Sequence, residues 1–190
     1  YHSFSSIWAF YVALVAGWTP VLICVSISVY GFGVAGVQGG LTGPVVARFG
    51  EIKAVTFALI VGIVSFVILG FAQTGLHIYF GILVGVFGGF LGPAIQALMT
   101  ERTPADSQGE LQGAITSLFS LSSIISPLIM AFLFSAYTDT TGPYMPGAPF
   151  LLAGVLGIFA LGIFAYGAKR LNEQLLPSDQ TTDELKETFD

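Results

Sequence analysis

The sequence predicts an all-α polytopic membrane protein, and three observations lead to this prediction. Hydrophobic residues make up 54% of the chain and charged residues 9%, whereas about 25% of an average soluble domain is charged. Long apolar runs recur along the chain, and a helix of about 20 residues crosses the hydrocarbon of a bilayer. The lysines and arginines between these runs fall in alternate gaps, which is typical of loops on alternating sides of a membrane.

The first apolar run, 4–16, is too short to span a bilayer, and we expect it to be the end of a helix that begins outside this sequence. Five complete runs follow, and we expect helices because a backbone in lipid has to satisfy its own hydrogen bonds. Pro20 suits the start of the first complete helix, and Gly43 with Pro44 suits its end. The five runs are 19–47, 54–72, 76–99, 111–137 and 148–168.

The gaps between the runs predict the orientation of the chain. The intervening gaps, around 72–76 and 137–148, carry no basic residue. Loops rich in Lys and Arg stay cytoplasmic, so we expect the basic gaps and the C-terminus to lie inside. The basic residues are Arg48 and Lys53 in one gap, Arg102 two runs later, and Lys169 and Arg170 after the last run.

The chain divides by composition into two parts. Residues 1–170 are predicted to form a transmembrane helical bundle, and residues 171–190 an acidic cytoplasmic tail. Apolar residues in the tail are too sparse to form a core of their own. The acidic residues there are Glu173, Asp179, Asp183, Glu184, Glu187 and Asp190.

Few polar residues lie inside the apolar runs. Gln38 lies in the first complete run and Gln96 near the inner end of the third, while Ser117 and Ser120 lie in the fourth. An amide in hydrocarbon is costly unless it is paired, so Gln38 should face another helix or a wet cavity. An interhelical hydrogen bond and a substrate contact both remain open for Gln38. For the serines, the alternative to a substrate contact is a hydrogen bond to their own helix backbone.

Glycine and proline positions predict how the helices pack and bend. Small residues four positions apart let membrane helices approach closely, either as static seams or as surfaces that slide during transport. Proline removes a helix hydrogen bond, so Pro93 and Pro127 predict bends in the third and fourth complete helices. The two small-residue ladders are Gly31, Ala35, Gly39 and Gly43 on the first complete helix, and Gly81, Gly85 and Gly89 on the third.

The residue types in the runs argue against an enzyme. Intramembrane hydrolases need nucleophiles, acids or metal ligands at membrane depth, and the runs offer only scattered hydroxyl groups. Cys24 is the single cysteine, which excludes an internal disulfide. We therefore predict no catalytic residues, no cofactor, no metal site and no nucleic-acid partner. Because the run centres contain no Asp, Glu, Lys, Arg or His, a proton carrier would have to lie outside this sequence.

Two segments carry a resemblance to a known family. Residues 92–99 followed by 108–113 look like the stretch that joins the tenth and eleventh helices of tetracycline-resistance-type efflux pumps in the major facilitator superfamily. Residues 41–51 resemble the loop between the eighth and ninth helices of these pumps. That loop is a variant of a repeated cytoplasmic signature in which a glycine is followed, after a short spacer, by Arg, one residue and Gly.

The resemblance implies that the chain is the C-terminal six-helix bundle of a major facilitator fold, with a partial first helix. It also implies half of a secondary active transporter that exports drugs or small amphipathic metabolites in exchange for protons, by alternating access. The implied partners are the lipid bilayer, the missing N-terminal half, a small-molecule substrate and protons. The implied location is a bacterial-type inner membrane.

The same resemblance assigns roles to residues. Arg48 would hold an inner gate by bonding helix-end carbonyls or a carboxylate, although a simple topology anchor is the alternative for Arg48 and Lys53. Gln112 is a candidate helix cap. The loop signature comprises Gly43, Arg48, Gly50 and Lys53; the start of the eleventh helix is shaped by Gln108, Gly109, Gln112 and Gly113; and the candidates for lining the substrate cavity are Gln38, Gln96, Ser117 and Ser120.

A competing prediction is a non-transporting membrane subunit, which keeps the helical bundle but packs against other subunits of a larger membrane complex. The lack of buried charge favours it. An upstream gene segment that encodes six further helices with an acid at membrane depth would favour transport instead.

Overall fold

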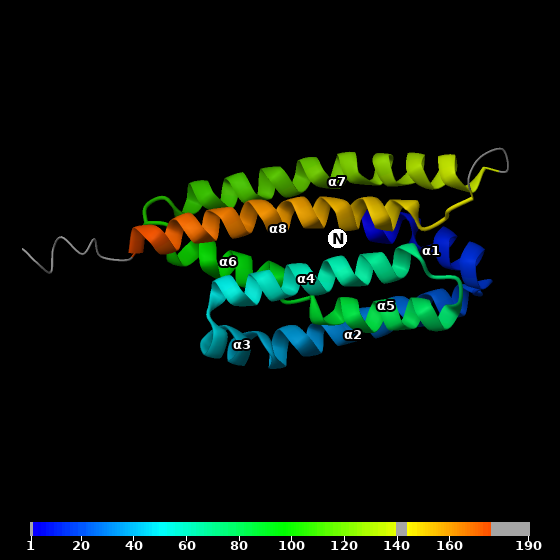
Figure 1. Ribbon diagram of the computed structural model, residues 1–190, viewed down its shortest axis with the longest axis horizontal. Coiled ribbons are helices and arrows are strands. Elements are labelled where there is room, and N and C mark those ends of the chain that lie inside the picture. Colours follow the sequence, from blue (N-terminus) through cyan, green and yellow to red (C-terminus); the bar gives the residue numbers. More distant parts are fainter. Residues whose placement is uncertain (1, 140–143, 176–190) are drawn as a thin grey trace, which may run out of the picture.

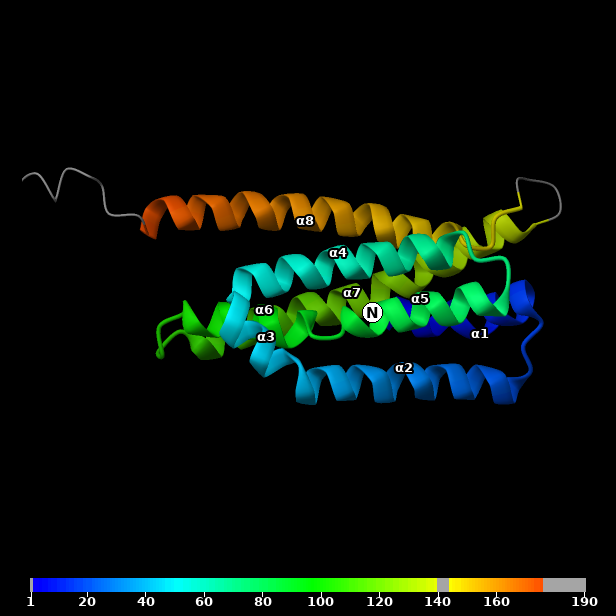
Figure 2. The ribbon, with the colours of Figure 1, turned by 60° about the horizontal axis from the view of Figure 1, so that its bottom comes forward.

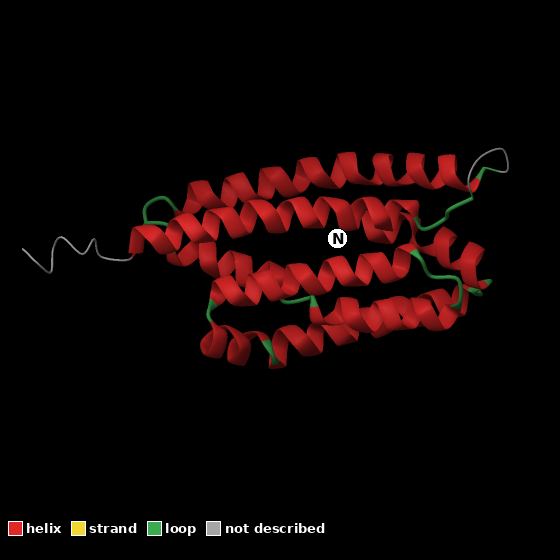
Figure 3. Cartoon of the chain, viewed as in Figure 1, coloured by secondary structure: helices red, strands yellow, loops and turns green. Residues whose placement is uncertain are grey.

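The structure, a computed structural model, describes residues 2–139 and 144–175. Within these ranges the regular structure is entirely helical, without strands (Figure 3). The predicted all-α fold class is confirmed. The helices are α1 (His2–Ala16), α2 (Pro20–Gly40), α3 (Thr42–Phe49), α4 (Glu51–Gly70), α5 (Gly75–Phe87), α6 (Leu91–Glu101), α7 (Gln108–Thr138) and α8 (Ala148–Leu175).

Five helical stretches in the described residues are long and apolar enough to cross a membrane. They are α2, α4, α7, the described part of α8 up to Arg170, and α5 together with α6. α1 is apolar but shorter, as expected for the run 4–16. The long helices lie along a common axis and form one elongated bundle (Figures 1 and 2). This arrangement suits a protein that is embedded in a bilayer.

The predicted helix 19–47 is in fact two helices, α2 and α3, which meet at Leu41. Gly43 and Pro44 therefore do not end a helix but lie in the first turn of α3. Proline is tolerated in a first turn because the backbone N–H that it lacks would have no partner within the helix there.

The predicted helix 76–99 is also interrupted, by a turn at residues 88–90 that separates α5 from α6. Pro93 lies in the first turn of α6, so the prediction that it bends a continuous helix was wrong. The chain breaks just before the proline, in a stretch that contains Gly88 and Gly89. Pro127, in contrast, lies inside the uninterrupted helix α7.

α8 continues to Leu175, past the predicted end of the bundle at position 170. The residues 171–175 are strong helix formers for the most part, so they extend the helix instead of beginning an irregular tail. The rest of the predicted acidic tail, 176–190, lies outside the described residues.

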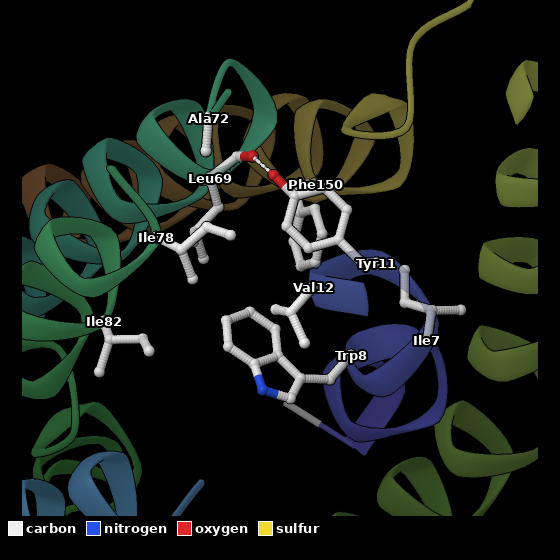
Figure 4. Close-up of a cluster of buried hydrophobic side chains, with 9 residues drawn as sticks. All are labelled: Ile7, Trp8, Tyr11, Val12, Leu69, Ala72, Ile78, Ile82 and Phe150. Carbon is white, nitrogen blue, oxygen red and sulfur yellow. Dashed lines mark hydrogen bonds between the residues drawn. The ribbon is translucent and has the colours of Figure 1, made fainter. Parts of the chain in front are cut away.

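α4 is the central helix of the packing, and it contacts α5, α6 and α8. One buried cluster joins Trp8, Tyr11 and Val12 of α1 to residues of α4, α5 and α8 (Figure 4). In this cluster the Tyr11 hydroxyl donates to the Leu69 carbonyl, and the Tyr11 and Phe150 rings meet edge to face with centroids 4.6 Å apart. A second cluster lies towards the other end and comprises Val37, Ala54, Val55, Ala58, Val86, Phe90 and Ala94.

The two predicted small-residue ladders behave differently. A methyl group added to Gly81 or Gly85 would lie 2.7 Å from the side chain of Leu69 or Ser65, so this ladder is a packed seam against α4. A methyl group added to Gly31, Gly39 or Gly43 would meet nothing within 4 Å. The ladder on α2 and α3 is therefore an open face among the described residues.

We expect Gly85→Ala to destabilise the bundle by about 1–3 kcal/mol, because the added methyl group would displace the Ser65 hydroxyl from its 2.9 Å hydrogen bond to the Gly81 carbonyl. Gly39→Ala is the matched control, since it makes the same change of helix propensity in open space. Unfolding of both variants in detergent, followed by circular dichroism, measures the difference. Equal stabilities would contradict the packed seam.

The gaps that carry basic residues all lie at one end of the bundle, where α3 meets α4 and where α6 and α8 end (left in Figure 1). The turns at the opposite end join α1 to α2, α4 to α5 and α7 to α8. The alternation of basic and non-basic gaps therefore gives the bundle two chemically different ends. We call the end with the basic residues the basic end. Its described basic residues are Arg48, Lys53, Arg102, Lys169 and Arg170.

Candidate functional site

A hydrogen bond joins the α2–α3 junction to the turn between α5 and α6. The Gln38 side chain, one turn before the junction at Leu41, donates from Nε2 to the Gly89 carbonyl oxygen at 2.8 Å. A helix end leaves carbonyl groups without a partner in the same helix, and the amide of Gln38 satisfies one of them. Of the two interpretations left open for Gln38, the structure contains the interhelical hydrogen bond.

A second polar link joins α6 to α7. The Gln96 side chain donates from Nε2 to Oε1 of Gln112 at 3.3 Å, and both residues are exposed. Two residues that were singled out for different roles are thus partners. Gln112 is not a helix cap, because α7 already begins at Gln108 and the Gln112 amide is engaged with α6.

The serine candidates lie on the open side of the bundle. α7 has no buried residue among those described. The Ser117 hydroxyl donates to the Gly113 carbonyl at 2.8 Å, which is the backbone bond expected as the alternative to a substrate contact. Ser120 is exposed, and its carbonyl accepts a 2.8 Å hydrogen bond from Ser123. A methyl group added to Gly109 or Gly113 would meet nothing within 4 Å, so the start of this helix is open as well.

Gly50 is the residue of the loop signature with a clear conformational role. It connects α3 to α4 with φ 81° and ψ 159°, a backbone conformation that side chains with a Cβ rarely adopt. Its N–H donates to the Val46 carbonyl at 2.9 Å, and its carbonyl accepts from the Ala54 N–H at 3.1 Å. The chain therefore leaves one helix and enters the next across a single residue.

Arg48 does not make the bond that was expected of an inner gate. Its guanidinium lies 5.8 Å from the ring centroid of the neighbouring Phe49, and it has no carbonyl or carboxylate partner among the described residues. Arg48 is exposed on α3 and does not line the cavity that Glu51 and Glu101 line. Lys53, in the first turn of α4, faces a cavity instead.

That cavity lies at the basic end and has a volume of about 720 Å³. Sequence reasoning missed it and gave no role to Glu51 or Glu101, whose side chains interact with each other there. The signal in the sequence that could have indicated this cavity was the recurrence of charged residues in the basic gaps. These residues served only to predict the orientation of the chain in the membrane. The lining residues are Val46, Phe49, Gly50, Glu51, Ile52, Lys53, Glu101, Arg102, Ala168 and Lys169.

Comparisons with known proteins agree with this architecture. Residues 2–187 match the family model described as Major Facilitator Superfamily. The chain is 36% identical over 124 residues to the class C tetracycline resistance protein of Escherichia coli, which covers 65% of the chain and 31% of that protein. It is 33% identical over 132 residues to the class G tetracycline resistance protein of Vibrio anguillarum, covering 70% of the chain and 34% of that protein. The matches thus span about a third of the length of these relatives, and no solved structure matches the chain.

Proposed function

Because this chain belongs to the Major Facilitator Superfamily, we propose that it is half of a secondary active transporter that exports drugs or small amphipathic metabolites in exchange for protons. The observation that carries the proposal is the similarity to proteins named for tetracycline resistance, at 33–36% identity over about two thirds of the chain. Tetracycline and related amphipathic drugs are therefore the first substrates to test.

The open faces of the bundle support a second half as the main partner. α7 has no buried residue among those described, and a methyl group added to Gly31, Gly39 or Gly43 would meet nothing within 4 Å. Transporters built from two bundles bind substrate at the interface between the bundles and rock one against the other. In this arrangement the exposed side of α7, with Ser117 and Ser120, faces the other half across the substrate pathway.

The interruptions in α2–α3 and α5–α6 suit the conformational change of alternating access. Non-helical backbone at membrane depth is tolerated where it lies inside the protein or along a water-filled cavity. The inner segments α3 and α6 run from these interruptions to the basic end, and there they close or open the inner side of the pathway. The basic end faces the cytoplasm in this proposal, since loops rich in Lys and Arg stay inside.

The proton-carrying group is assigned to the other half. The acidic residues described in this chain lie at helix ends or in turns, with none in the middle of a candidate span. A titratable group at membrane depth is expensive and is kept where a transporter needs one.

The test uses the full-length protein that contains this chain, in inverted membrane vesicles. A proton gradient is expected to drive tetracycline uptake, and a protonophore is expected to abolish it. Uptake equal to that of vesicles without the protein would refute export of this drug class. Copurification of the protein with an unrelated membrane complex, without proton movement, would support the structural subunit instead.

Within this transporter, Gln96→Leu is expected to lower the rate of uptake about fivefold, which corresponds to the loss of one hydrogen bond of about 1 kcal/mol between α6 and α7. Gln73→Leu is the matched control, because it removes the same amide from an exposed position at the opposite end. Initial rates of uptake and the melting temperature are measured for both variants. A fall in the melting temperature of Gln96→Leu alone would assign the pair to stability and not to transport.

A further inference from the structure

We propose that the cavity at the basic end binds the headgroup of an anionic phospholipid from the adjacent leaflet, with its phosphodiester on Lys53 and Arg102. The lipid stays bound at the perimeter of the bundle, at its basic end. This proposal holds whether or not the transporter exports drugs. It requires only the membrane-embedded bundle described above.

Basic side chains from three separate elements converge on this cavity. Lys53 comes from the first turn of α4, Arg102 follows the last residue of α6, and Lys169 comes from α8. Lys53 and Arg102 are exposed. Lysine and arginine are the side chains that bind phosphate oxygens best, through charge-assisted hydrogen bonds. Basic pockets between membrane helices are accordingly sites for acidic lipid headgroups.

The cavity is also lined by apolar residues, which a soluble anion would not need. Val46, Phe49, Ile52 and Ala168 line it together with the basic residues. Phe49 is 55% exposed, so its ring is available to an acyl chain or a glycerol backbone. A lining that combines apolar and cationic side chains matches a molecule with a phosphate next to hydrocarbon.

The depth of the cavity agrees with a headgroup. The candidate span of α4 begins at Glu51, and that of α5 with α6 ends at Glu101, so the cavity lies where two spans reach the edge of the hydrocarbon. Phospholipid phosphates occupy the same level of a bilayer. A volume of about 720 Å³ holds a headgroup with the start of its acyl chains.

The two acidic side chains limit the charge of the ligand. Glu51 and Glu101 interact with each other, and Glu51 also interacts electrostatically with Arg102. The lining combines three basic with two acidic side chains, which matches one phosphodiester better than a polyanion. The carboxylates can accept hydrogen bonds from headgroup hydroxyls, so phosphatidylglycerol is the probe of choice.

The experiment measures lipid binding to the intact protein that carries this sequence, by native mass spectrometry in detergent with added phosphatidylglycerol. The double variant Lys53→Gln/Arg102→Gln is expected to bind the first lipid at least about tenfold more weakly. The matched control is Arg48→Gln/Arg170→Gln, which loses the same charge at the same end from residues outside the cavity lining. Its affinity is expected to change less than about twofold.

Three outcomes would overturn the proposal. Equal losses in the two double variants would show a general attraction to the basic end instead of a site. Displacement of phosphatidylglycerol by inorganic phosphate would show a site for a soluble anion. Binding of phosphatidylethanolamine as tight as that of phosphatidylglycerol would remove the selectivity for an anionic headgroup. All four substituted residues are exposed, so both double variants are expected to melt close to the temperature of the parent protein. The melting temperatures are measured to check this.

Discussion

Replacing Gly147 with alanine is expected to destabilise the bundle by about 3 kcal/mol or more, because it would force α8 away from α4. A methyl group at Gly147 would overlap the carbonyl oxygen of Gly70 at the end of α4 and lie 2.8 Å from the Gly70 Cα. Both atoms belong to backbone, so no side chain can rotate to make room. The Gly147 carbonyl also accepts from the N–H groups of Phe150 and Leu151, and a shift here would therefore move the first turn of α8.

Gly162→Ala is the matched control for this variant. Gly162 lies within α8, and an added methyl group would meet nothing within 4 Å there. Thermal unfolding in detergent, followed by circular dichroism, should show a large fall in the melting temperature for the Gly147 variant only. If the Gly147 variant is as stable as its control, the close approach of α4 to the start of α8 is not present in the protein.

The second large effect is expected for Trp8→Ala, which should cost about 3 kcal/mol by opening a cavity in the cluster of Figure 4. Trp8 is 1% exposed, and its indole N–H donates to the Ser26 hydroxyl of α2 at 3.0 Å. The ring also meets Phe150 of α8 edge to face, with centroids 6.4 Å apart. A single side chain of α1 therefore contacts two other helices, and its loss weakens both contacts.

Phe10→Ala on the same helix is the control, because Phe10 is 68% exposed and lies outside the cluster. Trp8→Phe keeps much of the buried ring but removes the indole N–H, so it should lose only about 1 kcal/mol, the contribution of one hydrogen bond. The three unfolding free energies should rank in the order Trp8→Ala, Trp8→Phe, Phe10→Ala, from most to least destabilised. A Phe10 variant as unstable as the Trp8→Ala variant would contradict the packing of α1.

The number and place of the membrane helices could be predicted from the sequence because hydropathy acts over whole runs. The predicted run 54–72 corresponds to α4 at Glu51–Gly70, and the run 111–137 to α7 at Gln108–Thr138. The interruptions within two runs could not be predicted in the same way, since the sequence stays apolar across them. Gly43 and Pro44 indicated a helix end two to three residues past the actual break at Leu41, and Gly88 and Gly89 are as compatible with close packing as with a turn.

The candidate site depended more strongly on tertiary structure. Polarity at membrane depth drew attention to Gln38 and Gln96, but their hydrogen-bond partners, Gly89 and Gln112, lie 51 and 16 positions away in the sequence. Identical glycine spacing could not distinguish the packed ladder of α5 from the open ladder of α2, because the difference lies in what the rest of the fold brings near each face. The charged cavity escaped notice for the same reason.

The hydrogen bond from Gln38 to Gly89 has a mechanical consequence. It links the α2–α3 junction to the turn between α5 and α6, so a movement at one interruption has to carry the bond along or break it. α3 and α6 follow these two interruptions, and they are therefore coupled through one hydrogen bond between a side-chain amide and a backbone carbonyl. A tilt of α3 is transmitted to α6, and the reverse, through this 2.8 Å hydrogen bond.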